Sequence, residues 1–283
     1  MLRKVYLAPV DLADRFLGNR QESLPPKAST FTGGVKDFAA TGQMLLDALV
    51  ETAGMTPSGH LLDVGSGIGR LGIPSAGYLN ADGAYEGIDI VPDGIAWCKA
   101  NISSPHNNVN FTLADVFNKE YHPKGRMRAS EYTFPFEDNS FDVAVLISVF
   151  THMLPEEVDR YLSEISRVLK PGGRCFISYF LISPEVEALT DGTNVQRRFK
   201  HNLGNYSVSS LKVPELAVGY QETYIRELYA KHDFEDDPAL YYGAWSGRTA
   251  HWPKDSGLGD QDTFVATKRI PVPADEADTP ANT

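Results

Sequence analysis

Leu61-Leu62-Asp63-Val64-Gly65-Ser66-Gly67-Ile68-Gly69-Arg70 is the stretch that decides the fold of this chain. An apolar run ends in an acidic residue and then breaks into glycines, which is typical of a buried parallel strand that turns into a helix around a bound nucleoside. Gly65 and Gly67 can adopt backbone angles closed to other residues and let the main chain approach a ligand. The NAD fingerprint G-x-G-x-x-G would need a glycine where Arg70 stands, so the stretch departs from that pattern.

Strand and helix signals alternate along the chain, which is the pattern of a parallel sheet. The expected strands are 60–64, 84–89, 109–113, 141–147 and 174–180, with 243–245 closing a sixth and 263–268 forming a seventh. The expected helices are 38–52, 68–78, 93–102, 155–169 and 222–232, and Pro171-Gly172-Gly173 is interpreted as a turn that starts the fifth strand. The sequence therefore predicts an α/β fold: a doubly wound, Rossmann-like, seven-stranded and mostly parallel sheet with helices on both faces and an antiparallel last strand.

Three segments lie outside this alternation. Residues 1–40 are expected to form an N-terminal leader in which the glycine-flanked Phe31 is either a flap over the ligand or a core aromatic. Residues 41–270 are expected to form the main domain, and 182–221 are expected to be a lid insertion because structureless insertions of that length inside a compact domain are usually lids or binding loops. Tyr206, Tyr220 and Tyr224 are interpreted as lid or packing residues. Residues 271–283 are rich in Pro, Ala and Asp and are expected to be disordered.

The composition limits the partners of the protein. Its formal charge of −11 disfavours a nucleic-acid partner, because phosphate binding relies on Lys and Arg. Cys98 and Cys175 lack metal-ligand spacing and are expected to be buried thiols in a reducing compartment. The sequence has neither a signal-peptide pattern nor an apolar run long enough to cross a bilayer. We therefore expect a cytoplasmic protein without a membrane partner that acts on a small molecule, either as a monomer or as a homodimer.

Acidic residues follow two further strands. Asp89 ends the second strand, where a carboxylate faces the ribose hydroxyls of a nucleoside held by the first strand. Its alternative role is to cap the following helix, for which Asp93 is the better candidate. Asp115 ends the third strand and can accept a hydrogen bond from an adenine amino group, or it can be part of a surface turn. Together with Asp63 these residues predict a crevice surrounded by three strand-end acids.

A longer set of motifs follows in order. Residues 134–143 read FPFEDNSFDV, residues 148–154 read SVFTHML, and residues 167–173 read RVLKPGG. With the glycine stretch, they make residues 60–180 resemble the small-molecule branch of the class I S-adenosylmethionine-dependent methyltransferases. In that branch a PF-x-x-x-x-FD segment, a His-Met/Leu-Leu segment and an R-x-L-K-P-G-G turn recur. The flanks of the chain resemble the family poorly.

The resemblance implies S-adenosylmethionine as the cofactor and assigns its contacts. The methionine part would be surrounded by the glycine stretch, ribose and adenine by the ends of the next two strands, and the path to the acceptor by the end of the fourth strand. The implied residues are, in that order, Asp63, Gly65, Ser66 and Gly67; Asp89, Ile90, Asp115 and Val116; and Ile147 and Ser148. Arg70 departs from the commoner small or apolar residue of the family and is expected to project from the first helix turn.

His152 is the candidate catalytic residue. Four residues separate it from the end of the predicted fourth strand, and a hydroxyl acceptor must lose a proton near neutral pH, a task to which His is well matched. Its alternative roles are to stabilise the start of a helix or to bind the acceptor without proton transfer. The seven histidines are scattered without ligand spacing, so we expect no metal.

The sequence thus predicts a methyltransferase of small molecules that transfers methyl in line, with O-methylation of a natural product, glycan or quinone-type metabolite as the first hypothesis. N- or C-methylation of a small molecule is the alternative. A non-catalytic S-adenosylmethionine-binding module and a nicotinamide-dependent reductase are the rivals from other classes. Arg70 and the lack of a Tyr-x-x-x-Lys pair after the fourth strand disfavour the reductase.

Overall fold

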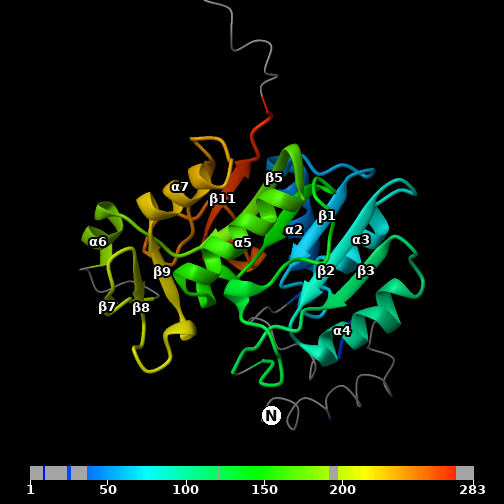
Figure 1. The fold of residues 1–283 in the computed structure, drawn as a ribbon, viewed down its shortest axis with the longest axis horizontal. Coiled ribbons are helices and arrows are strands. Elements are labelled where there is room, and N and C mark those ends of the chain that lie inside the picture. Colours follow the sequence, from blue (N-terminus) through cyan, green and yellow to red (C-terminus); the bar gives the residue numbers. More distant parts are fainter. Residues whose placement is uncertain (1–8, 10–23, 27–36, 120, 191–196, 272–283) are drawn as a thin grey trace, which may run out of the picture.

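The computed structural model describes residues 9, 24–26, 37–119, 121–190 and 197–271. Its centre is a seven-stranded sheet (Figure 1) in the order β10-β11-β5-β4-β1-β2-β3. In chain order the strands are β1 (His60–Val64), β2 (Ala84–Asp89), β3 (Val109–Leu113), β4 (Phe141–Leu146), β5 (Leu169–Tyr179), β10 (Ala239–Tyr241) and β11 (Asp262–Thr267). β1 to β5 are parallel, and β11 runs antiparallel to both β5 and β10. The predicted fold class is confirmed.

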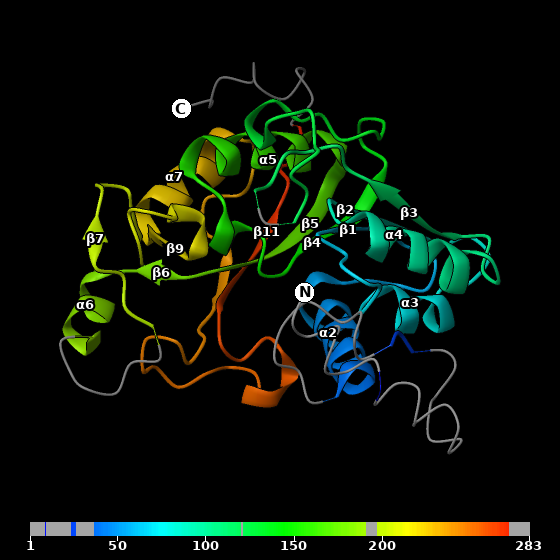
Figure 2. The same cartoon turned by 90° about the horizontal axis from the view of Figure 1, so that it is seen from below.

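Helices cover both faces of this sheet (Figure 2). α5 (Pro155–Val168) and α7 (Glu222–Lys231) lie on one face, and α2 (Phe38–Ala53), α3 (Gly72–Tyr78) and α4 (Pro92–Cys98) lie on the other. Because side chains alternate along a strand, adjacent residues of β1 enter different cores. Leu61 packs in the core under α2, and Leu62 packs in the core under α5. This burial on both faces explains why the central strands are nearly continuous apolar runs.

Several element boundaries differ from the sequence expectation. α3 begins at Gly72 instead of residue 68, because residues 67–71 form turns that follow the glycines. α4 ends at Cys98 and continues as a π-helical turn over Lys99–Ser103. The sixth strand, β10, precedes the expected 243–245. Short edge strands such as this one carry too few residues for a clear alternation.

The Pro171-Gly172-Gly173 segment belongs to β5 and does not form a separate turn before it. β5 pairs with β4 from Leu169 to Phe141, and the pairing then shifts so that Arg174 lies opposite Val143. The extra residues of β5 form a bulge at this shift, and Gly172 has the left-handed φ of 79°. The expected start of the strand at residue 174 was therefore wrong.

The expected lid insertion is an ordered extension of the fold, apart from residues 191–196, which lie outside the described residues. It contributes α6 (Pro184–Thr190) and most of a second sheet in the order β6-β9-β8-β7. These strands are β6 (Leu181–Ile182), β7 (His201–Asn202), β8 (Tyr206–Val208) and β9 (Val218–Gln221). Tyr220 is fully buried and its hydroxyl donates to the carbonyl oxygen of Met153 at 2.5 Å. Its packing role is confirmed, and the insertion is fixed against the turn that follows β4.

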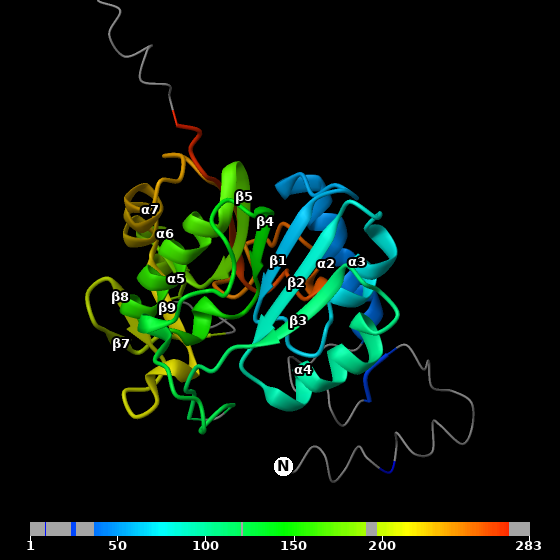
Figure 3. The ribbon, with the colours of Figure 1, turned by 45° about the vertical axis from the view of Figure 1, so that its right-hand side comes forward.

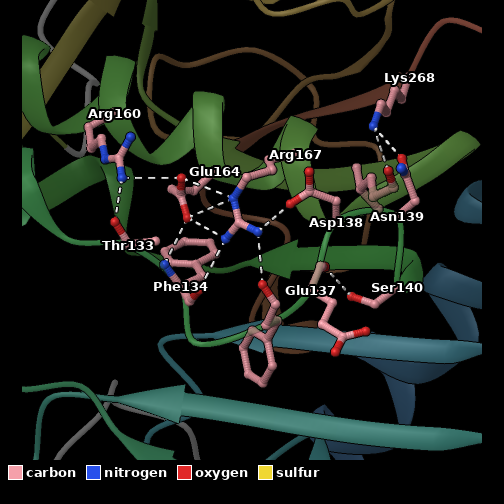
Figure 4. A network of polar contacts seen from close by, with 12 residues as sticks. Thr133, Phe134, Glu137, Asp138, Asn139, Ser140, Arg160, Glu164, Arg167 and Lys268 are labelled. Atoms are coloured by element: carbon pink, nitrogen blue, oxygen red, sulfur yellow. Dashed lines mark hydrogen bonds and ion pairs between the residues drawn. The ribbon is translucent and has the colours of Figure 1, made fainter.

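Arg160 and Arg167 of α5 hold the segment before β4 (Figure 4), and Arg160 donates to the carbonyl oxygen of Tyr132 and the hydroxyl oxygen of Thr133. Arg167 of α5 donates to the carbonyl oxygens of Phe134 and Phe136 at 3.0 and 2.8 Å, and it pairs with Glu164 at 2.6 Å. The Glu164 carboxylate is 3% exposed and accepts the backbone N–H of Phe134 at 2.8 Å. These contacts explain why the segments 134–143 and 167–173 occur together. They lie toward the amino ends of β4 and β5, the edge opposite the strand-end acids.

Among the described residues, no helix is long and apolar enough to cross a membrane. Phe31 and most of the predicted leader and tail lie outside the described residues, which include only 9, 24–26 and 37–40 of the leader and 271 of the tail. Both cysteines are buried as expected, and burial raises the pKa of each thiol.

Candidate active site

The carboxyl ends of β1 to β4 meet at one edge of the sheet, where the loops that follow them form the candidate site (Figure 3). The loop after β1 is built around glycine. Gly65 and Gly67 have φ values of 84° and 59°, in the left-handed region that favours glycine. A Cβ atom on Gly65 would lie 2.4 Å from Cγ2 of Val149, so the loop packs directly against the turn after β4. The hydroxyl of Ser66 is buried and has no hydrogen-bond partner among the described residues.

Asp89 ties the ends of β1 and β2 together. Its Oδ2 accepts the backbone N–H of Gly67 at 2.8 Å, and its Oδ1 accepts the backbone N–H of Val91 at 2.8 Å. Burial raises the pKa of this carboxyl, and the backbone N–H groups oppose the rise. Asp89 therefore faces the glycine loop as predicted. It also binds the N-cap residue of α4, whereas Asp93 lies within the first turn and does not cap the helix.

Asp63 lies beneath the same loop. It is 6% exposed, and its Oδ2 accepts the hydroxyl of Tyr85 at 2.6 Å. Burial raises the pKa of Asp63 to about 7, while the Tyr85 hydrogen bond and the charge of Arg70 act in the opposite direction. No described residue donates to its second oxygen, so the carboxylate keeps acceptor capacity toward the loop.

Arg70 does not project from a helix, and this expectation was wrong. It lies in the turn before α3, with its carbonyl oxygen 2.2 Å from where a Cβ on Gly42 of α2 would stand. Its side chain is half-buried, and burial lowers the pKa of the guanidinium against the opposing charge of Asp63. No described residue forms a hydrogen bond or an ion pair with the guanidinium, whose Nη1 lies 3.6 Å from where a Cβ on Gly257 would stand.

Asp115 lies at the same edge but is already paired. Arg126, from the loop between β3 and β4, donates through Nε to Oδ2 of Asp115 at 2.5 Å and lowers the pKa of the carboxyl. The next residue, Val116, is 3% exposed, and Ile90 is half-buried. The structure therefore brings Asp63 and Asp89 together at the glycine loop, whereas Asp115, the third acid of the expected crevice, forms an ion pair with Arg126.

The turn after β4 carries Ile147, Ser148 and His152. Ser148 has a φ of 59°, which is uncommon for a residue with a Cβ and is often found at functional sites. His152 ends a short 3₁₀ helix (Phe150–His152) and is exposed. Its Nδ1 is 2.9 Å from the carbonyl oxygen of Glu215 in the insertion, so Nδ1 carries the proton. Nε2 of the neutral ring is then free to accept a proton.

Three residues of this edge were missed from the sequence: Tyr85, Arg126 and Gln261. Tyr85 alone carried a signal, because it faces the same side of the sheet as Leu61 and sits in the strand that ends in Asp89. Arg126 and Gln261 lie in loops without periodicity, and their positions follow from the tertiary fold. Among the described residues, no group of three or more His, Cys, Asp or Glu side chains could hold a metal ion.

Residues 62–177 match the model of a family described as a methyltransferase domain. The methyltransferase GfsG of Streptomyces halstedii is 26% identical over 151 residues, 52% of this chain and 47% of that protein. The sterol 4-C-methyltransferase strm-1 of Caenorhabditis elegans is 29% identical over 170 residues, 60% and 43% of the two chains. The chain spans about half the length of the curated relatives it matches.

The similar proteins differ in the methylation that their names describe. They include an O-methyltransferase of Penicillium expansum and a tRNA N(3)-cytidine methyltransferase of Gallus gallus, so similarity does not separate acceptor types or exclude RNA. Among solved structures, the PH0226 protein of Pyrococcus horikoshii has a TM-score of 0.51 at 18% identity, covering 84% of this chain and 93% of that one. This likeness concerns the fold alone.

Proposed function

We propose that the chain is a class I S-adenosylmethionine-dependent methyltransferase that binds its donor at the glycine loop and methylates a small molecule, because residues 62–177 match the model of a methyltransferase domain. The observation that carries the proposal is the carboxylate of Asp89 facing Gly67 across 2.8 Å, beside the free oxygen of Asp63. A nucleoside with an amino acid attached offers hydroxyls, an ammonium and a carboxylate. The loop presents acids for the first two and Arg70 for the third.

The residues fit this donor. The buried hydroxyl of Ser66 has no partner among the described residues, and the main chain at Gly65 is exposed. Asp63, Gly65, Ser66, Gly67 and Arg70 would hold the methionine part. Asp89 and Ile90 would hold ribose and adenine. Asp115 and Val116 would lie at the adenine edge, provided that Arg126 shares or releases the carboxylate of Asp115.

S-adenosylmethionine supplies an activated methyl group on a sulfonium, so the protein has mainly to align the reactants and exclude water. Ile147 and Ser148 would line the path between donor and acceptor. The free Nε2 of His152 supports a role as general base for a hydroxyl acceptor, because the bond to Glu215 fixes the tautomer that a base requires. We therefore propose O-methylation as the first reaction to test, on a natural product, glycan or quinone-type metabolite.

We further propose that the acceptor is a small molecule and that the protein works in the cytoplasm. The net charge of −11 supports a neutral or cationic acceptor over a nucleic acid. The domain boundaries of the proposal are the leader 1–40, the catalytic domain 41–270 and the tail 271–283. A homodimer is the assembly to examine by sedimentation, because a second copy could bring residues to the open edge.

Two measurements test the function. Isothermal titration should show micromolar binding of S-adenosylmethionine and S-adenosylhomocysteine, and none of NADH. Transfer of a radiolabelled methyl group should then be screened against phenols, carboxylic acids, amines and a tRNA pool. Absence of donor binding would overturn the proposal, and binding without transfer to any acceptor would favour the non-catalytic module. Transfer only to amines, to carbon or to tRNA would replace the O-methylation hypothesis.

A further inference from the structure

Three side chains from different elements form a closed ring of hydrogen bonds beside the turn after β4. The backbone N–H of Ser148 donates to the hydroxyl oxygen of Ser178 in β5 at 2.8 Å. The Ser178 hydroxyl donates to Oε1 of Gln261 at 2.6 Å, and Nε2 of Gln261 donates to the hydroxyl oxygen of Ser148 at 2.8 Å. Ser178 is 1% exposed, whereas Ser148 is exposed.

The ring fixes the direction of every proton in it. A backbone N–H can only donate, so the Ser178 oxygen must accept from Ser148, and the Ser178 proton then points to Gln261. Turning the amide of Gln261 over would deprive that buried proton of its acceptor, which is costly. The amide NH₂ therefore faces Ser148, and the proton of the Ser148 hydroxyl is turned out of the ring.

The turn that carries this hydroxyl lies next to the donor loop. Val149, the neighbour of Ser148, has its Cγ2 atom 2.4 Å from where a Cβ on Gly65 would stand, so the turn that carries Ser148 touches the glycine loop directly. On the other side Gln261 directly precedes β11 and closes the ring. The left-handed φ of 59° at Ser148 holds the residue in this place.

We propose that Ser148 donates a hydrogen bond to the methyl acceptor, and that Gln261 is the positioning residue that turns the Ser148 proton toward it. The acceptor then belongs to the class of molecules that present an oxygen or nitrogen lone pair to this position, and purely hydrocarbon surfaces are disfavoured there. This inference rests on the proposed function, since it places the acceptor beside the donor loop.

The test reverses the direction of the Ser148 hydroxyl proton through a substitution that keeps the length of the side chain at position 261. In Gln261→Glu the carboxylate can only accept, so the Ser178 proton stays on one oxygen and the Ser148 proton turns to the other, away from the site. Gln221→Glu, at the end of β9, is the matched control for the added charge. Ser148→Ala removes the donor altogether.

Ligand-observed NMR on protein saturated with S-adenosylhomocysteine supplies the readout. The probes are acetophenone and α-methylstyrene, which have nearly the same shape, but only the first has a carbonyl oxygen. We expect acetophenone to bind wild type and Gln221→Glu about five- to tenfold more tightly than α-methylstyrene, the ratio typical of one hydrogen bond. The ratio should fall to about one in Ser148→Ala and Gln261→Glu, while the dissociation constant of S-adenosylhomocysteine stays within about twofold.

Equal binding of the two probes to wild type, or no binding of acetophenone, overturns the inference. So does a Gln261→Glu variant that keeps the wild-type ratio. The titration with S-adenosylhomocysteine precedes the probes, so a protein that fails to bind it overturns the proposed function and is recognised at that step.

Discussion

Oδ2 of Asp89 accepts the backbone N–H of Gly67 across 2.8 Å, so the ends of β1 and β2 are joined by the carboxylate that we assign to the donor ribose. The bond gives the acid two tasks. It positions the glycine loop before any ligand arrives, and it holds a negative charge where two sugar hydroxyls can reach it.

Asp89→Ala should therefore weaken S-adenosylmethionine binding at least about tenfold, because charge-assisted hydrogen bonds are lost. Isothermal titration measures the change, and Asp82→Ala, an exposed acid before β2, is the control. Circular dichroism should show a folded variant. An unaltered dissociation constant would remove the ribose assignment.

Asp63 makes the stability of the free protein depend on pH. Its pKa is raised to about 7 by burial, against an ordinary value near 4, so between those pH values the folded state keeps a proton that the unfolded state releases. The free energy of unfolding should then decrease as the pH rises from 5 to 8. Asp262, raised to about 6 by burial, acts in the same direction.

In Asp63→Asn the free energy of unfolding should decrease less between pH 5 and pH 8 than in wild type, by an amount on the order of 1–4 kcal/mol, since the amide does not ionise. Urea unfolding at pH 5 and pH 8 provides the measurement. A variant whose stability decreases as steeply as that of wild type would show that Asp63 titrates normally.

His152 can be separated into its two roles by choice of substitution. In His152→Asn the amide nitrogen can replace Nδ1 as the donor to Glu215, while the position of Nε2 is left empty. If His152 is the base, kcat should fall roughly 10²–10⁴-fold, with the melting temperature and the donor affinity nearly unchanged. A variant with full activity per folded molecule would leave His152 as an anchor of the insertion.

Arg167 should matter for stability and hardly for the site. Arg167→Met leaves the buried Glu164 with the weaker partner Arg160 at 3.2 Å and removes the Arg167 hydrogen bonds to the carbonyl oxygens of Phe134 and Phe136, of which that of Phe134 keeps the backbone N–H of Phe136. We expect a loss of about 2–4 kcal/mol in urea unfolding. Lys231→Met, which breaks an exposed pair with Asp159, should cost less than about 1 kcal/mol. An equal loss in both variants, or a large change in donor affinity, would contradict this assignment.

The central strands could be predicted from the sequence because the residues that determine them are neighbours in the chain. β1 is a mostly apolar run before the glycines, β2 and β3 carry buried apolar residues among polar ones ahead of Asp89 and Asp115, and all three strands have the predicted bounds. β10 and the start of β5 could not be predicted, since a three-residue edge strand and a bulged one are determined by pairing partners distant in the sequence.

The candidate site likewise contains residues that could be predicted from the sequence and residues that could not. Asp89 was predictable because the end of β2 must face the loop after β1 in a parallel sheet. The pairing of Asp115 with Arg126 was not, because it depends on how a loop without periodicity folds back. Arg70 was assigned the wrong direction because the helix expected from residue 68 begins four residues later.

The contacts of Arg167 have a consequence for recognising proteins of this kind. The segments that it joins are the longest part of the sequence signature, yet they brace the edge of the sheet that faces away from the donor loop. Their contacts stabilise the fold and involve none of the residues that we assign to the donor. A descendant that had lost Asp89 and His152 would still carry both of these segments, so the residues of the opposite edge are the better test of whether such a chain is still an enzyme.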